Sequence, residues 1–208
     1  MNKSFRLAMV TGLGAAVAVV HAQVSFALVA GYYTLDSSGP FNFVYIPNGA
    51  AGTVDFTPTA PAFSIGDSTT FGSGVGTIIY TVTSAVPIIG IDMTVQGNVN
   101  QFGEVNWTET AETSSGNLGT INGSDKGSAY SGGVDGAFTQ VEHLTFSHAV
   151  TDFKVKKTFD IDIGGNLPPS QSSASVSLIE QNMVPVPEPA TIVGLGVGAI
   201  ALIRRRKK

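Results

Sequence analysis

Cysteine is absent from the 208 residues of this chain. The chain therefore has no disulfide bond, no thiolate ligand for a metal ion and no cysteine nucleophile. Charged residues are also few, at 12%, whereas glycine is frequent, with 25 residues. Much glycine and little charge favour β-strands joined by tight turns over helices. A domain of this kind depends on its own core for stability.

Basic residues are scarce between the two ends of the chain. Four lysines stand there against 15 aspartates and glutamates in the whole chain, all of them between Asp36 and Glu188. The lysines are Lys126, Lys154, Lys156 and Lys157. An acidic body argues against nucleic acid as a partner, because phosphates require a basic face. We interpret the acidic side chains as solubilising, with cation binding as the alternative.

The first 27 residues have the pattern of a secretory signal peptide. Lys3 and Arg6 precede a 14-residue apolar stretch over 7–20, and small residues follow at two cleavage sites, after Ala22 and after Ala27. Fourteen helical residues reach about 21 Å, which is short of a bilayer core of about 30 Å. The sequence predicts a signal helix that is removed.

The other end of the chain has a similar order of features. Residues 185–189 contain three prolines, residues 190–203 are apolar or small without a charge, and a basic cluster ends the chain. The cluster consists of Arg204, Arg205, Arg206, Lys207 and Lys208. The apolar run predicts a short transmembrane helix, and the basic cluster stops it on the cytoplasmic side. The central body is then expected to face outward.

Residues 185–208 resemble a PEP-CTERM sorting signal. The resemblance rests on Pro187-Glu188-Pro189, the apolar run, the basic end and a signal peptide at the opposite terminus, all in order. It implies a Gram-negative bacterium or cyanobacterium that makes extracellular polysaccharide. It also implies an exosortase, a membrane-embedded processing enzyme, that recognises the signal and removes the tail. The three motif residues are the expected recognition site.

The chemistry of the motif agrees with that role. Pro187 and Pro189 keep the backbone extended, because proline lacks the N–H of a helix and forces its neighbour out of the helical region. An extended segment fits a protease cleft, and Glu188 offers one negative charge between two rigid neighbours. A proline-rich hinge before a permanent anchor would not need Glu188.

The body, residues 28–184, shows apolar and polar residues in alternation. In the stretch 153–163 the apolar face has one exception, Lys157. Turns rich in Gly, Asn, Asp and Pro separate such stretches. One-sided apolar strands in a chain of this length predict an all-β fold, an antiparallel β-sandwich of eight to ten strands, with a barrel as the alternative. The polar segment 111–136 is expected to be a long loop or an irregular edge.

Side chains with catalytic or metal-binding chemistry are few and scattered. His143 and His148 are five residues apart, which places them on opposite faces of a single strand. Asp160 and Asp162 share a face and suit Ca²⁺, but lysines of the same face favour a solubilising role. We therefore expect no catalytic residue, no metal site and no cofactor.

These patterns predict an exported, non-enzymatic protein of the cell surface or extracellular matrix with a structural or adhesive role. The expected partners are an exosortase-like membrane protease, the inner membrane as a transient anchor, and extracellular polysaccharide. A carbohydrate-binding module that uses Trp107 or Tyr130 is one alternative. A secreted hydrolase built around His143 or His148 is another.

Overall fold

The computed structural model describes residues 24–48, 52–66, 71–164 and 171–187. Within these ranges every regular element is a strand, and all pairings are antiparallel. The predicted all-β fold is thus confirmed. The strands are β1 (Val24–Leu35), β2 (Ser38–Asn48), β3 (Thr53–Pro58), β4 (Ser64–Gly66), β5 (Ser73–Asn100), β6 (Glu104–Thr113), β7 (Gly116–Lys126), β8 (Gly136–Asp162) and β9 (Ser173–Pro185).

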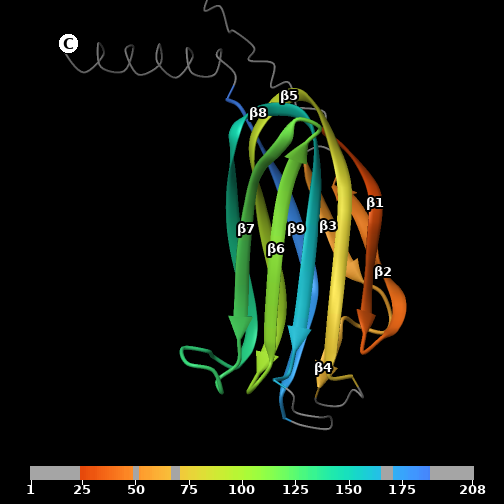
Figure 1. The fold of residues 1–208 in the computed structure, drawn as a ribbon, viewed down its shortest axis with the longest axis vertical. Coiled ribbons are helices and arrows are strands. Elements are labelled where there is room, and N and C mark those ends of the chain that lie inside the picture. The colour runs from red at the N-terminus through yellow and green to blue at the C-terminus, as the bar shows by residue number, and fades with distance from the viewer. Residues whose placement is uncertain (1–23, 49–51, 67–70, 165–170, 188–208) are drawn as a thin grey trace, which may run out of the picture.

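The strands form the two layers of a sandwich, because β5 and β8 arch over one end and belong to both (Figure 1). In the first layer, residues 73–83 of β5 pair with β1 and with residues 152–162 of β8, and the latter pair with β6. In the second layer, residues 88–100 of β5 pair with β9 and with the first half of β8. The register of β5 against β8 shifts between Thr83 and Ile88, where both strands bend.

Part of the sheet also closes into a barrel, which was the alternative prediction. Strands β9, β3, β2, β1 and β5 form a closed ring, since β9 pairs with β5 as well as with β3. β4 adds to the edge of β9, and β8, β6 and β7 extend the first layer beyond the ring. Closure removes the exposed strand edge on the β2 side of the sandwich.

The core lies between the layers and follows the alternation of the sequence. In β8, Phe153, Val155, Phe159 and Ile161 point inward and are at most 4% exposed. At one end the rings of Tyr33, Phe43 and Phe63 pack together, with Tyr33 and Phe63 centroids 4.9 Å apart. Large buried aromatic rings contribute strongly to core stability.

For the segment 111–136 the prediction of a long loop is wrong, whereas the alternative, an edge of the sheet, is confirmed in part. Strand β6 continues to Thr113, and β7 follows after a short turn as the edge strand of the first layer. β7 pairs on one side only and has a largely exposed or half-exposed pattern, so it does not need the apolar alternation of a central strand. Gly123 permits this packing, because a Cβ there would lie 2.3 Å from the Trp107 ring. Of the predicted loop, residues 127–135 remain outside the strands.

Both ends of the described chain lie at the arched end of the sandwich, which we call the tail pole (residues 24, 84–88, 148–152 and 185–187). Val24 pairs with Ser84, and Pro185 pairs with Ile88. The opposite end, the distal pole, consists of the turns at 36–37 and 101–103 and the loop 127–135 (Figure 1). The two poles therefore separate the attachment of the tail from the loops.

Of the predicted signal peptide, residues 1–27, the first 23 lie outside the described residues and residues 24–27 form the start of β1. The predicted transmembrane helix, residues 190–203, lies outside the described residues. In the part of the chain that the structure describes, no helix has the length and hydropathy of a membrane span.

We predict that signal peptidase cleaves after Ala22 rather than after Ala27. Residues 24–27 of β1 pair with residues 81–84 of β5, and cleavage after Ala27 would remove this pairing. N-terminal sequencing of the exported protein should therefore find Gln23 as the first residue. A mature chain that starts at Leu28 would contradict the prediction.

Candidate functional site

The sorting motif begins where the last strand ends. Pro185 is the last residue of β9, and the Val186 N–H donates to the Pro87 carbonyl over 2.8 Å at the tail pole. Pro187 follows without regular structure. Its predicted partners in the motif, Glu188 and Pro189, lie outside the described residues, as does the basic cluster 204–208. The body thus holds the start of the motif by a backbone hydrogen bond.

The loop of the distal pole is held by Asp135. Its carboxylate accepts hydrogen bonds from the Gln101 N–H over 2.6 Å, from the Ser128 N–H over 2.8 Å and from the Ser128 hydroxyl over 2.7 Å. These bonds stabilise the charged form, with those from Ser128 contributing most, and lower the pKa of Asp135. The charged carboxylate therefore orders the loop between β7 and β8.

Exposed aromatic surface lies beside this loop. Phe102 is 41% exposed, and its ring meets that of Tyr130 edge-on with centroids 6.0 Å apart. The Tyr130 hydroxyl donates to the Phe102 carbonyl over 3.3 Å, and the Lys126 ammonium lies 5.3 Å from the centroid of the Tyr130 ring. The alternative use of Trp107 as a sugar platform is wrong, since Trp107 is 3% exposed and stacks on Phe138 in the core.

The two histidines are exposed and lie apart along β8. His143 Nδ1 is 2.8 Å from Asp92 Oδ1, and His148 Nδ1 is 3.1 Å from the hydroxyl of its neighbour Ser147. Asp160 lies near Glu104 and Asp162; burial raises its pKa, and the neighbouring charges raise it further. Among the described residues no group of three or more His, Asp or Glu side chains could hold a metal ion.

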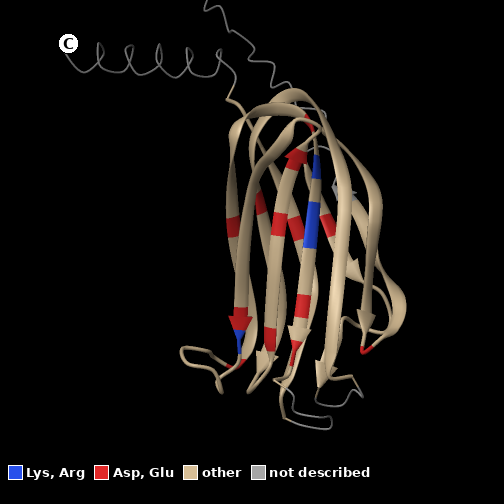
Figure 2. Ribbon diagram, viewed as in Figure 1, with Lys and Arg blue, Asp and Glu red and all other residues tan. Residues whose placement is uncertain are grey.

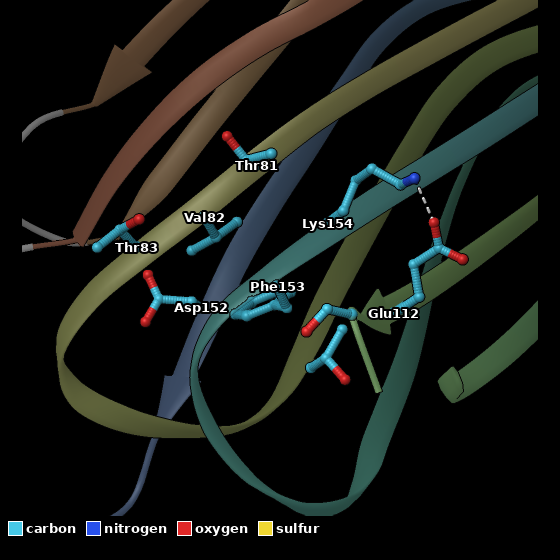
Figure 3. A pocket seen from close by; sticks show the side chains of 9 residues that line it. Thr81, Val82, Thr83, Glu112, Asp152, Phe153 and Lys154 are labelled. Atoms are coloured by element: carbon cyan, nitrogen blue, oxygen red, sulfur yellow. Dashed lines mark ion pairs between the residues drawn. The ribbon is translucent and has the colours of Figure 1, made fainter. Parts of the chain in front are cut away.

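A pocket at the tail-pole end of the first layer has a mixed lining (Figure 3). Residues 81–83 of β5, residues 112–114 at the end of β6 and residues 152–154 of β8 line it. Two of the lining residues, Lys154 and Glu112, form an ion pair (Figure 3). This pair is partly exposed, so it contributes little to stability.

The most unusual polar group lies in the middle of the core, and we call it the buried cluster (Lys157, Glu109 and Gln181). Each of the three residues is 0% exposed. They come from β8, β6 and β9, so the cluster spans both layers. The other described lysines lie on β8 and at the end of β7, whereas acidic positions are spread over several strands and turns (Figure 2).

Lys157 Nζ is the centre of this cluster. It donates to Glu109 Oε1 and to Gln181 Oε1, and it lies 3.0 Å from Met93 Sδ. Gln181 Nε2 in turn donates to the Asp92 carbonyl over 3.0 Å. Glu109 Oε2 is buried without a hydrogen-bond partner, as is the Tyr80 hydroxyl. The amide of Gln181 therefore has hydrogen bonds at both its oxygen and its nitrogen, whereas one carboxylate oxygen of Glu109 has none.

Burial changes the ionisation of the cluster. Loss of water disfavours charge, which lowers the pKa of Lys157, with the attraction of Glu109 as the opposing effect. The same loss raises the pKa of Glu109 against the attraction of Lys157. Burial of an ion pair costs on the order of several kcal/mol per ion, so both groups shift toward their neutral forms.

The sequence indicates part of this cluster. Lys157 is the exception in the alternation of 153–163, and the structure places it on the inner face as that pattern requires. Glu109 was missed, although it follows Val105 and Trp107 at spacings of two on the inner face of β6. Gln181 follows the buried Ile179 in the same way on β9.

Comparison with known families decides the nature of the tail. Residues 185–207 are a PEP-CTERM protein-sorting motif. The matched segment thus starts at the last residue of β9 and covers Pro187, Glu188 and Pro189. It marks the protein for export with a C-terminal membrane-anchoring sorting signal and for exosortase processing. A search of the curated protein sequences gave no match.

Solved structures resemble the body of this PEP-CTERM protein only distantly. TmCBM61 in complex with β-1,4-galactotriose is 10% identical, with a TM-score of 0.33, over 79% of this chain and 89% of that chain. The CBM36-1 domain of a xylanase from the hindgut metagenome of Trinervitermes trinervoides is 11% identical, with a TM-score of 0.28, over 78% of this chain and 99% of that chain. The arabinose-bound α-L-arabinofuranosidase MgGH51 is 11% identical, with a TM-score of 0.32, over 74% of this chain and 25% of that chain. Likenesses this distant carry no argument about what the body binds.

We predict that Asp135 titrates below the ordinary aspartate pKa of about 3.9. Because the pKa is lowered in the folded state, the stabilisation is present above the unfolded pKa and is lost as the pH falls through the folded pKa. An NMR titration should show the amide protons of Gln101 and Ser128 moving together at that lower pH. Asp135→Asn should abolish this step, and a midpoint at or above the ordinary value would contradict the prediction.

Proposed function

We propose that this protein is a non-enzymatic structural or adhesive component of the cell surface or extracellular matrix. The PEP-CTERM signal delivers it across the inner membrane, holds it there transiently and is then removed by an exosortase-type protease. The observation that carries the proposal is the junction at Pro185, where the last strand of the sandwich becomes the first residue of the motif.

The junction sets the orientation of the body during sorting. Because Val186 is bonded to the Pro87 carbonyl, the described chain has no free linker between the sandwich and Pro187. The tail pole then faces the membrane, and the distal pole with its ordered loop faces away from it. A basic end on the cytoplasmic side agrees with this direction.

The short junction also affects how the motif is presented to the protease. Pro187 follows the end of β9 by two residues, and proline restricts both its own backbone and that of the residue before it, which favours presentation to the protease in a restricted conformation. Glu188 supplies the charge that a cationic recognition pocket would bind.

We predict that Glu188→Ala leaves the precursor unprocessed. In cells with the active processing enzyme, mass spectrometry should find the wild-type exported protein without residues 204–208 and the variant in the membrane with them. Asp152→Asn is the matched control, because it removes an exposed carboxylate at the tail pole outside the motif and should be processed normally. Wild-type protein that retains the basic end would refute the sorting proposal.

Polysaccharide binding is the second candidate function, favoured by the exposed Phe102 beside Tyr130 at the distal pole. Sugar rings stack on such aromatic faces.

If the distal pole binds polysaccharide, the wild-type protein should bind the exopolysaccharide of its host in a pull-down assay. Phe102→Ala should lower this binding about tenfold, as expected for the loss of about 1.4 kcal/mol of stacking. Val141→Ala, at an exposed apolar position of β8, serves as the control. Equal binding by wild type and Phe102→Ala would remove this candidate.

A further inference from the structure

The buried cluster combines the three chemical groups that an amide-forming reaction requires. An amine, a carboxamide and a carboxyl meet at one point in the core, on three strands that are separate in the sequence. Solubility does not explain them, because all three residues are 0% exposed. A hydrophobic residue at position 157 would fill the same space without the cost of burying an ammonium group. The cluster therefore calls for a chemical explanation.

The amine of Lys157 is the nucleophile of this set. A lysine is nucleophilic only as the neutral amine, and desolvation in an apolar site is the usual way to obtain that form. Burial lowers the pKa of Lys157 in this direction. Its Nζ contacts the amide oxygen of Gln181, so the electrophilic carbon Cδ is the next atom along that bond.

The carboxamide of Gln181 is the acyl donor. Its Nε2 donates to the Asp92 carbonyl over 3.0 Å, which fixes the plane of the amide while Lys157 Nζ stands at the oxygen end. Groups held in contact react much faster than the same groups free in water, because their entropy of approach is already lost. An amide that is otherwise unreactive can therefore be attacked at this position.

Glu109 is the proton carrier. Its Oε1 contacts Lys157 Nζ, and its Oε2 is buried without a hydrogen-bond partner. A carboxyl with one oxygen at the nucleophile and a raised pKa can take a proton from nitrogen and return it to a leaving group.

We infer that Lys157 and Gln181 join spontaneously in an intramolecular isopeptide bond, with Glu109 transferring the proton. Lys157 Nζ forms a bond to Gln181 Cδ, and the bond from Cδ to Nε2 breaks. Glu109, in its protonated form, gives its proton to Nε2, which leaves as ammonia, and takes the proton that Nζ loses, so the carboxyl ends in the form in which it began. Atoms and electrons balance without an oxidant, a reductant or a cofactor.

The topology favours Gln181 over Glu109 as the acyl donor. Glu109 and Lys157 are already direct cross-strand neighbours within one layer. A bond to Gln181 instead connects β8 of the first layer with β9 of the second, and it leaves the carboxyl of Glu109 free to transfer the proton. In a chain without cysteine, such a bond supplies the covalent link between layers that a disulfide would otherwise provide.

The test is peptide mapping of the folded, full-length protein. After unfolding and digestion, tandem mass spectrometry should find a branched peptide that joins Lys157 to Gln181, lighter than the two linear peptides together by one ammonia, about 17 Da. Only linear peptides with a free Lys157 amine and an unmodified Gln181 would overturn the proposal. A branched peptide that joins Lys157 to Glu109 with loss of water, about 18 Da, would overturn the assignment to Gln181.

Variants separate the roles of the three residues. Lys157→Met and Gln181→Met should yield linear peptides only, and the exposed neighbour Lys156→Met should keep the branched peptide. Glu109→Gln keeps the shape of the side chain but has no carboxyl, so the branched peptide should fall to a small fraction of the wild-type amount. Cross-linking of Glu109→Gln to the wild-type extent would refute proton transfer by Glu109. The wild-type map decides the main proposal even if a variant fails to fold.

Discussion

The pairing of β5 with β8 is the interaction on which the rest of this structure depends. It runs from Ser73 opposite Asp162 in the first layer to Val99 opposite Gly136 in the second. Because both strands cross the tail pole together, they place the two layers face to face in one register. That register brings Lys157, in the second half of β8, across from Met93 in the second half of β5, where β9 supplies Gln181. A shift by one residue would turn these side chains outward.

Among the described residues, the buried cluster holds the two fully buried charged side chains, Lys157 and Glu109. Its three residues stand among large hydrophobic neighbours such as Ile78 and Tyr80, which keep water away from them. A polar group in such a place is expensive unless each member has a partner, and the unpaired oxygen of Glu109 is the conspicuous exception. The arrangement is therefore costly for the stability of the fold but suits a reaction between the three side chains. A covalent bond between the layers would stabilise an exported domain that has no disulfide bonds.

The two poles of the molecule carry the two features on which the proposed functions depend. The tail pole carries the junction with the PEP-CTERM motif and holds it by the bond from Val186 to Pro87. The distal pole carries the loop ordered by Asp135 and the exposed ring of Phe102. The motif thus begins within the fold, at the last residue of β9. Any contact with matrix or polysaccharide depends on the surfaces of the sandwich.

The amino-acid sequence by itself determined the sorting motif and the all-β class. The motif is one contiguous segment, residues 185–207, so its residue order is sufficient, and the strands follow from alternation that is local to each stretch. The sequence also indicated Lys157, because it is the one polar residue on the apolar face of the alternating stretch 153–163. Only the tertiary structure decided the edge strand β7, the burial of Trp107 and the meeting of Lys157 with Glu109 and Gln181. These partners are 48 and 24 residues from Lys157 in the chain. They meet because strand register is set by the packing of whole layers, which no local pattern specifies.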